Sequence, residues 1–350
     1  MFDAYHPADL TCAVPAETPL DQLQLRLAAD RLHWPVDPPG PSCWTVASAA
    51  AAHADGPIRY SEGPLRDQVI ACRYRLPDGL VRKSGAAVAK NVAGFAMHRL
   101  LCGTGQAIAR FEQLTLRLRP LAQTRITAQT RPLAIDALGP LQERLLTAET
   151  LSLAYVDAAS TGYGELHLRA GCWGLPGAML LAADALAGLL PDATIHTDAA
   201  ALTTWAHHRD DPLSGLQASR VWQIGCPVGR IGACLEGLWA WSSQRGLPAP
   251  AVQVCLGDGL IRFGWAQDPA KVADSSGTAL AETSPEPTQT ASLAQALLDH
   301  LRPPGATEPG PLIVVYPAFV PRELPTELQR VAEALHALPA DADQPQRSPA

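Results

Sequence analysis

Short segments in which apolar and polar residues alternate recur along the chain, and this is the pattern of half-buried β-strands. The clearest case is Leu114, Leu116 and Leu118, which alternate with polar residues until Pro120 ends the segment. Two further strands are predicted at residues 9–14 and 69–76. A Pro-Asp-Gly sequence follows the second and predicts a turn into a short partner strand that ends near Arg82. The first third of the chain is therefore rich in predicted strands.

Amphipathic or alanine-rich segments predict helices between these strands. Thr18 is expected to cap a helix whose leucines, from Leu20 to Leu27, form an imperfect apolar stripe. Residues 44–53 are alanine-rich, and residues 95–101 are expected to form a short helix. The first part of the chain thus mixes helices with strands.

A second mixture of strands and helices begins after residue 120. Strands are predicted at 126–135, 151–156, 165–170, 220–226 and 312–316, with a hairpin at 252–265 across Gly257-Asp258-Gly259. Helices are predicted at 177–190, 229–243 and 293–301. This mixture predicts an α+β fold. We expect domains at 1–120 and 121–337, the second an antiparallel sheet with helices on one face, a flexible loop at 268–290 and a disordered tail at 338–350.

Composition narrows the functional classes. The chain of 350 residues is 47% hydrophobic and 17% charged, with a net charge of -7, so it is globular and an unlikely partner for nucleic acid. The apolar runs are too short to span a membrane, and the first residues lack the features of a signal peptide, so we expect the cytoplasm. The eight cysteines form no C-x-x-C pair, which argues against an iron–sulfur cluster or zinc site in this chain.

One short run carries most of the functional information. Lys90, Asn91, Val92, Ala93 and Gly94 follow a Ser-Gly pair and precede a short predicted helix. Small residues and backbone N–H groups beside one cation and one amide suit close approach to a flat, polar ligand that bears phosphate. An ordinary glycine-containing loop is the alternative interpretation.

Four segments in this order and spacing resemble one family. They are residues 14–20, residues 35–39, residues 56–67, and residues 85–103 with the strand at 114–120. Together they resemble the FAD-binding subunit of bacterial glycolate oxidase, which has a PCMH-type FAD-binding domain and is part of the vanillyl-alcohol-oxidase superfamily. The resemblance is strongest over residues 7–120 and continues more weakly beyond them.

The resemblance implies a cofactor, partners and a reaction. FAD would lie between two α+β subdomains and contact the run from Lys90 to Gly94, together with Gly56 and Gly103. Lys90 would pair with a phosphate or with a carboxylate such as Asp67. The partners would be a larger FAD-containing subunit and an iron–sulfur subunit. The reaction would oxidise a small 2-hydroxy acid to a 2-oxo acid, and the resemblance names no catalytic acid or base in this chain.

The chain also departs from the family pattern. It begins at the strand that follows the family's glycine-rich pyrophosphate loop, and residues 44–50 replace a Gly-Gly turn. Gln106 and Ala109 stand where the family has glycines, and we expect that a backbone with positive φ is not kept there. A scaffold subunit that has lost FAD is therefore the alternative function. A missing subdomain would leave apolar surface around Val36, Trp44 and Val46 for a partner.

Three further features have structural interpretations. The cluster His207-His208-Arg209-Asp210-Asp211 could supply a base or a metal ligand, but a solvated loop is the favoured interpretation. Residues 225–229 are most simply a turn between a strand and a helix. A local ion pair between Arg66 and Asp67 is favoured over a cofactor contact.

Overall fold

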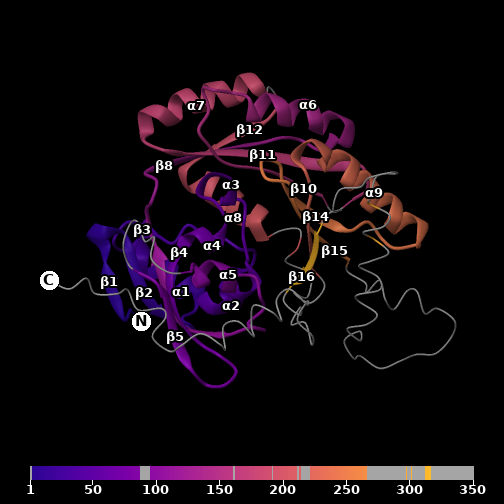
Figure 1. The fold of residues 1–350 in the computed structure, drawn as a ribbon. Coiled ribbons are helices and arrows are strands. Elements are labelled where there is room, and N and C mark those ends of the chain that lie inside the picture. Colours follow the sequence, from indigo (N-terminus) through magenta and orange to yellow (C-terminus); the bar gives the residue numbers. More distant parts are fainter. Residues whose placement is uncertain are drawn as a thin grey trace. The chain divides into compact units, whose positions relative to one another are not determined.

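The chain folds into two compact units, Met1–Leu121 and Ala122–Ala318. The computed structural model shown in Figure 1 describes residues 2–86, 95–160, 162–190, 192–210, 213, 221–265, 297, 301 and 312–316. Within these residues every strand pairs with its neighbours in antiparallel fashion. The predicted α+β class is confirmed.

The first unit is built on a five-stranded sheet in the order β1-β2-β6-β4-β5. Its strands are β1 (Ala4–His6), β2 (Thr11–Pro15), β4 (Val69–Arg75), β5 (Val81–Gly85) and β6 (Arg110–Arg117), and β3 (Leu32–His33) pairs separately with β7 (Arg119–Pro120). Its helices are α1 (Leu20–Ala28), α2 (Val46–Ala52), α3 (Arg59–Glu62), α4 (Leu65–Gln68) and α5 (Met97–Leu101). Val14 faces Leu114, and both side chains are fully buried, so these central strands anchor the core.

The second unit is built on a long antiparallel sheet in the order β12-β8-β11-β10-β14-β15-β13-β16, and β9 also pairs with β11. The strands are β8 (Thr124–Gln129), β9 (Leu133–Ala134), β10 (Leu153–Ser160), β11 (Glu165–Gly174), β12 (Thr194–Thr197), β13 (Val221–Gly225), β14 (Ala251–Cys255), β15 (Leu260–Gly264) and β16 (Leu312–Tyr316). The helices are α6 (Ile135–Leu146), α7 (Pro176–Leu189), α8 (Asp198–Asp210) and α9 (Ile231–Gln244).

Helices lie on both faces of this second sheet, so the predicted single helical face is wrong. Figure 1 shows α6, α7 and α9 along one face and α8 against the other. Thr127 on β8 donates a hydrogen bond to the carbonyl of Ala201 on α8, at 3.4 Å, and contacts Tyr155 of β10 at 2.7 Å. Polar side chains of the sheet therefore help to hold α8.

Local predictions differ from the structure in two places of the second unit. The strand predicted at 126–135 stops at Gln129, and α6 begins at Ile135 although Pro140 lies inside it. The sequence from His207 to Asp210 forms the last turn of α8 and not a loop. The guanidinium of Arg209 lies 4.7 Å from the centre of the Trp205 ring, a contact that helical spacing allows.

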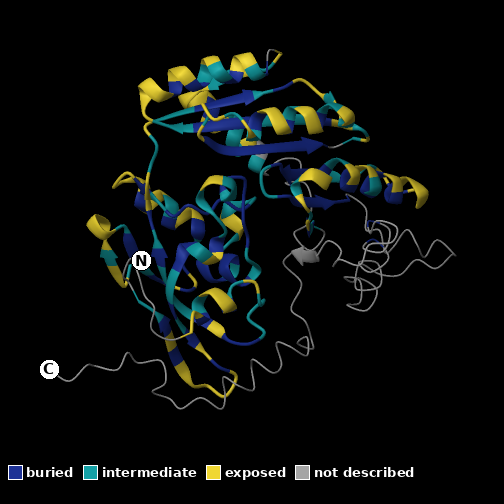
Figure 2. Ribbon diagram, turned by 45° about the horizontal axis from the view of Figure 1, so that its top comes forward, coloured by how far each residue is buried: buried dark blue, intermediate teal, exposed yellow. Residues whose placement is uncertain are grey.

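The predicted apolar surface in the first unit is also wrong. Val46 is fully buried, Val36 is 5% exposed, and Trp44 is only partly exposed, so these side chains do not form an uncovered apolar surface. Thr18 does not cap α1, because its hydroxyl donates to the carbonyl of Pro15 at 2.7 Å. Figure 2 shows instead that α7 has a largely exposed outer face, where Leu180 and Leu181 are 72% and 73% exposed.

Candidate cofactor-binding site

In the sequence, the predicted cofactor loop stands between two segments of the first unit that are hydrogen-bonded to each other. Lys90, Asn91, Val92, Ala93 and Gly94 lie outside the described residues. On either side of them, the buried hydroxyl of Ser84 donates to the carbonyl of Phe95 at 3.1 Å. The same oxygen accepts the N–H of His98 at 3.4 Å. The contact of the run with FAD stays a prediction, but its two flanks are joined by a defined set of hydrogen bonds.

Gly85 directs the chain from β5 into this loop. Its φ is +80°, and a Cβ on it would lie 2.2 Å from the carbonyl oxygen of Ile70. Any side chain there would collide with the backbone of β4, so this position requires glycine. The Ser-Gly pair before the predicted loop therefore has a clear structural role in the hairpin that carries the loop.

Gly56 and Gly103 lie around one polar network in the first unit. A Cβ on Gly56 would lie 1.8 Å from the carbonyl oxygen of Asp37, so glycine is needed there for close packing of two segments. Gly103 has a φ of +85°, and its Cβ would lie 3.3 Å from the Cβ of His53. These contacts explain both glycines without a ligand, and the role of either residue in binding FAD stays a prediction.

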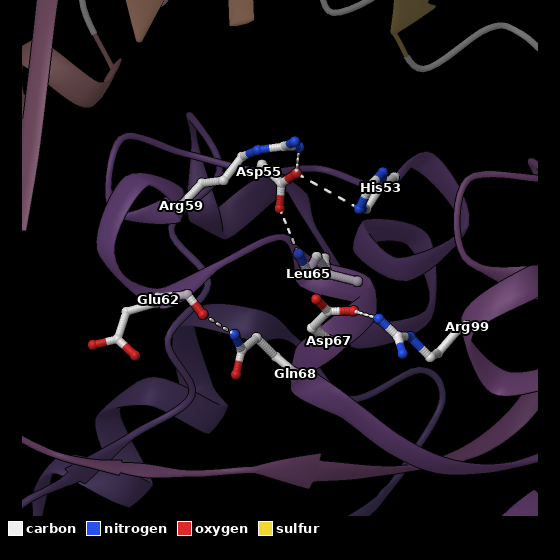
Figure 3. A network of polar contacts seen from close by, with 8 residues as sticks. All are labelled: His53, Asp55, Arg59, Glu62, Leu65, Asp67, Gln68 and Arg99. Carbon is white, nitrogen blue, oxygen red and sulfur yellow. Dashed lines mark hydrogen bonds and ion pairs between the residues drawn. The ribbon is translucent and has the colours of Figure 1, made fainter. Parts of the chain in front are cut away.

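Asp55 is the centre of that network, which Figure 3 shows. Its carboxylate is buried and accepts hydrogen bonds from Arg59 at 2.5 Å and from the backbone N–H of Leu65 at 2.7 Å. The Nε2 atom of His53 lies 3.6 Å from the same carboxylate. A buried carboxylate requires such partners, because its desolvation is costly. Asp55 thus joins the end of α2 to α3 and to the start of α4.

His53 ends α2 in the left-handed region, with a φ of 51°. Burial lowers the pKa of His53, and the nearby Asp55 carboxylate offsets this only in part. Arg59 and Arg66 also lower that pKa. The ring is therefore neutral at pH 7, and each neutral imidazole has one donor and one acceptor nitrogen for hydrogen bonding.

Charged side chains of both signs surround the network. Asp67 on α4 pairs with Arg99 on α5, so the predicted local pair between Arg66 and Asp67 is wrong. The side chain of Arg66 is exposed. The charged side chains at and around the network are four cations and four anions: Arg59, Arg66, Arg99 and Arg119, and Asp37, Asp55, Glu62 and Asp67. The network therefore carries no net positive charge while His53 is neutral.

Of the two positions where the family's glycines are replaced, Gln106 has a left-handed backbone and Ala109 does not. Gly105 has a φ of +60°, and Gln106 has a φ of +61° although it is not glycine. A non-glycine residue in this region costs about 1 kcal/mol, so surrounding contacts must hold it. The expectation that Gln106 cannot keep a positive φ is therefore wrong.

The contact of FAD with this end of the first unit stays a prediction. Ser84 ties the two segments that flank the predicted loop, and Gln106 has a left-handed backbone although it is not glycine. One segment does not match the family pattern: Thr45, in the stretch that replaces the family's Gly-Gly turn, caps α2 through a reciprocal pair of hydrogen bonds with Ser48. In the described ranges, no three His, Cys, Asp or Glu side chains gather as metal ligands would.

Comparison with known proteins gives partial sequence matches and a broad structural match. No family model matches the chain. It is 29% identical over 125 residues to the mitochondrial D-lactate dehydrogenase [cytochrome] of Arabidopsis thaliana, a match that covers 36% of this chain and 22% of that protein. It is 26% identical over 158 residues to the glycolate oxidase subunit GlcE of Escherichia coli K12, which covers 44% of this chain and 45% of that subunit.

The resemblance predicted from the sequence is confirmed. Alkyldihydroxyacetonephosphate synthase has the same fold in two crystal forms, with TM-scores of 0.57 and 0.56 at 10% and 11% identity. The matches cover 78% and 75% of this chain and 58% and 56% of the synthase chains. The chain spans less than half the length of the two curated relatives, 22% and 45%. None of the helices in the described part is long and apolar enough to cross a membrane.

Proposed function

We propose that this chain is the FAD-binding subunit of a complex of the glycolate oxidase type, which oxidises a small 2-hydroxy acid to a 2-oxo acid. Two observations carry the proposal: the similarity to GlcE, and the left-handed backbone at Gln106, where the resemblance implies a glycine. A costly backbone conformation at a residue other than glycine is favoured where the turn has a use. Both named relatives act on 2-hydroxy acids, glycolate and D-lactate.

In this proposal the chain's own residues position the cofactor. The run from Lys90 to Gly94 supplies backbone N–H groups, one amide and one cation, and Ser84 ties together the segments on either side of it. The exposed cation Arg66 attracts the phosphates. Bound FAD would supply the redox chemistry, and these residues would hold and orient it. The partners are a larger FAD-containing subunit and an iron–sulfur subunit, and the complex works in the cytoplasm.

A scaffold subunit without FAD is the second candidate function, and Thr45 favours it. In place of the family's Gly-Gly turn, Thr45 and Ser48 cap the start of α2. The backbone N–H of each residue donates to the side-chain oxygen of the other. N–H groups engaged in this way are not free to hold a phosphate. This candidate predicts assembly with the same partners and no flavin in this subunit.

The absorbance spectrum of the purified full chain, alone and after mixing with its two partner subunits, tests the proposal. We expect flavin bands whose stoichiometry exceeds that of the partner subunits alone, and loss of the blue band when glycolate or D-lactate is added without oxygen. Assembly of a complex whose flavin content equals that of the partners alone would overturn the proposal and support the scaffold candidate.

A further inference from the structure

The outer face of α7 is apolar and exposed. The helix packs on the second sheet through Met179, Ala182 and Leu186, which are buried and share one side of the helix. On the other side Leu180 and Leu181 are largely exposed, and Figure 2 shows exposed residues along this side of the helix. Adjoining exposed leucines on a helix of a globular chain indicate a surface that binds another molecule.

The charge of this face is low and of one sign. Asp184 is the single charged residue in the sequence of α7, which has no lysine or arginine. The side chain of Asp184 is exposed, and it lies on the same side of the helix as Leu181, three residues earlier. Amphipathic helices that bind anionic lipid surfaces are rich in basic residues, so a membrane is a poor occupant for this face.

The first turn of α7 offers the opposite partial charge. Leu175 supplies no side-chain cap, and Pro176 has no N–H. The first hydrogen bond within the helix runs from the N–H of Met179 to the carbonyl of Leu175, at 3.1 Å. The N–H groups of Gly177 and Ala178 come before this bond, and such groups at the start of a helix attract an anion. One exposed apolar face therefore holds both a carboxylate and a complement for it.

We infer that this face of α7 is the interface of a dimer, in which a second copy of the chain packs its own α7 antiparallel to the first around a two-fold axis near Leu181. Asp184 lies three positions after Leu181, and Gly177 and Ala178 lie four and three positions before it. The axis therefore places Asp184 of each copy beside the first turn of the other. Leu180 and Leu181 of the two copies meet at the centre.

Two further points support a second copy as the occupant. A contact around a two-fold axis requires one surface to complement itself, and this face does so both in its leucines and in its charges. A Cβ on Gly177 would meet no atom within 4 Å among the described residues outside its chain neighbours, so there is room for a carboxylate beside it. The inference rests on the second unit alone and does not require the proposed function.

Sedimentation velocity of the full chain tests the inference. An interface built on one helix is smaller than the roughly 1,200 Å² of a stable complex, so we expect a reversible equilibrium of monomer and dimer between about 1 and 100 µM. Leu181→Glu should raise the dissociation constant of the dimer at least about 100-fold, because it removes a leucine from the centre twice and brings like charges together.

Leu25→Glu is the matched control for this substitution. Leu25 on α1 is 76% exposed, close to the 73% of Leu181, so neither variant should impair folding. We expect the dissociation constant of the dimer to be the same in Leu25→Glu as in the wild type.

Asp184 tests the antiparallel arrangement of the two helices. Asp184→Asn should raise the dissociation constant about tenfold, because a charge is lost at the first turn of both helices, and Asp184→Glu should stay close to the wild type. Added salt should weaken the wild-type dimer more than the dimer of Asp184→Asn.

Three results would overturn the inference. One is a wild-type chain that stays monomeric over the whole concentration range, including the case in which Leu181→Glu weakens binding to the partner subunits instead. The second is a dimer whose dissociation constant does not change in Leu181→Glu. The third is an equal effect of Leu181→Glu and Leu25→Glu.

Discussion

The hydroxyl of Ser84 and the carbonyl of Phe95, eleven residues apart, are joined by a hydrogen bond of 3.1 Å across the base of the proposed cofactor loop. Ser84→Ala removes this bond and leaves the N–H of His98 without its 3.4 Å acceptor. We expect a loss of about 1–2 kcal/mol in the free energy of unfolding and a lower flavin content. Urea denaturation and flavin stoichiometry measure the two effects.

Ser61→Ala is the matched control for this substitution. Ser61, on α3, makes a local bond of 3.3 Å to the carbonyl of Ile58. It should change stability by no more than about 1 kcal/mol and leave the flavin content unchanged. Equal flavin content in all three proteins would show that the tie between Ser84 and Phe95 does not support a cofactor loop.

Substitutions within the predicted loop separate two contributions to flavin binding: close approach of the backbone to the ligand, and the charge of Lys90. Gly94→Val should lower flavin occupancy strongly, because a branched side chain would intrude where backbone meets ligand. Lys90→Ala should weaken binding by only about 1–2 kcal/mol, the value of one charge-assisted hydrogen bond. Flavin stoichiometry of the reconstituted complex measures both, with His207→Ala on α8 as control. Full occupancy with Gly94→Val in an assembled complex would favour the scaffold candidate.

Asp55 should contribute more to stability than the more exposed Asp67. Asp55→Asn leaves Arg59 without its anionic partner and weakens the bond to the N–H of Leu65, so a loss of about 2–4 kcal/mol is expected. Asp67→Asn breaks an ion pair whose side chains are 51% and 36% exposed, and should cost less than about 1 kcal/mol. Urea denaturation at pH 7.5 compares them, and equal losses would contradict the central role of Asp55.

The neutral ring of His53 should make stability depend on pH. Its pKa in the folded chain lies below the ordinary value of about 6.5. As the pH falls below about 6.5, the unfolded chain binds a proton that the folded chain binds less readily, so the free energy of unfolding falls until the pH passes the folded pKa. His98 contributes in the same direction, because burial lowers its pKa as well.

His53→Asn isolates the contribution of the His53 ring to the pH dependence of stability. Asparagine tolerates the left-handed conformation that ends α2, so the helix end is kept. We expect the loss of stability between pH 7.5 and 5.5, measured by urea denaturation, to be smaller in this variant than in the wild type. His6→Asn, at an exposed position outside the network, should leave the pH dependence unchanged. An unchanged pH dependence in His53→Asn would contradict the prediction.

The parts of the fold that could be predicted depend on local pattern. The hairpins at 69–85 and 251–264 have alternating residues and a glycine turn, and both form as expected. The helix α6 was missed because Gly139 and Pro140 interrupt its pattern, and packing overrides these weak local signals. The whole of α8 was missed, and the run of charged and histidine residues at its end does not reveal which ring it lies against.

The sequence predicted the region of the candidate site. It did not predict which polar side chains pair with each other there. The motif from Lys90 to Gly94 and the two glycines indicated where to look, because glycine and small residues carry a local signal. The partners of Asp55 and Asp67 could not be predicted, since α2, α4 and α5 are brought together only by the tertiary fold. The prediction for Gln106 was wrong because glycine is preferred at positive φ but is not the only residue that can adopt it.

The pairing of β16 with β13 has a consequence for the synthesis of the chain. Leu312–Tyr316 lies beside Val221–Gly225, so one side of β13 gains its partner only after a long intervening stretch has been made. Until then, a strand with unpaired backbone groups is exposed as the chain leaves the ribosome. A chain interrupted before Leu312 would keep that open edge, where a second incomplete copy could add its own strand.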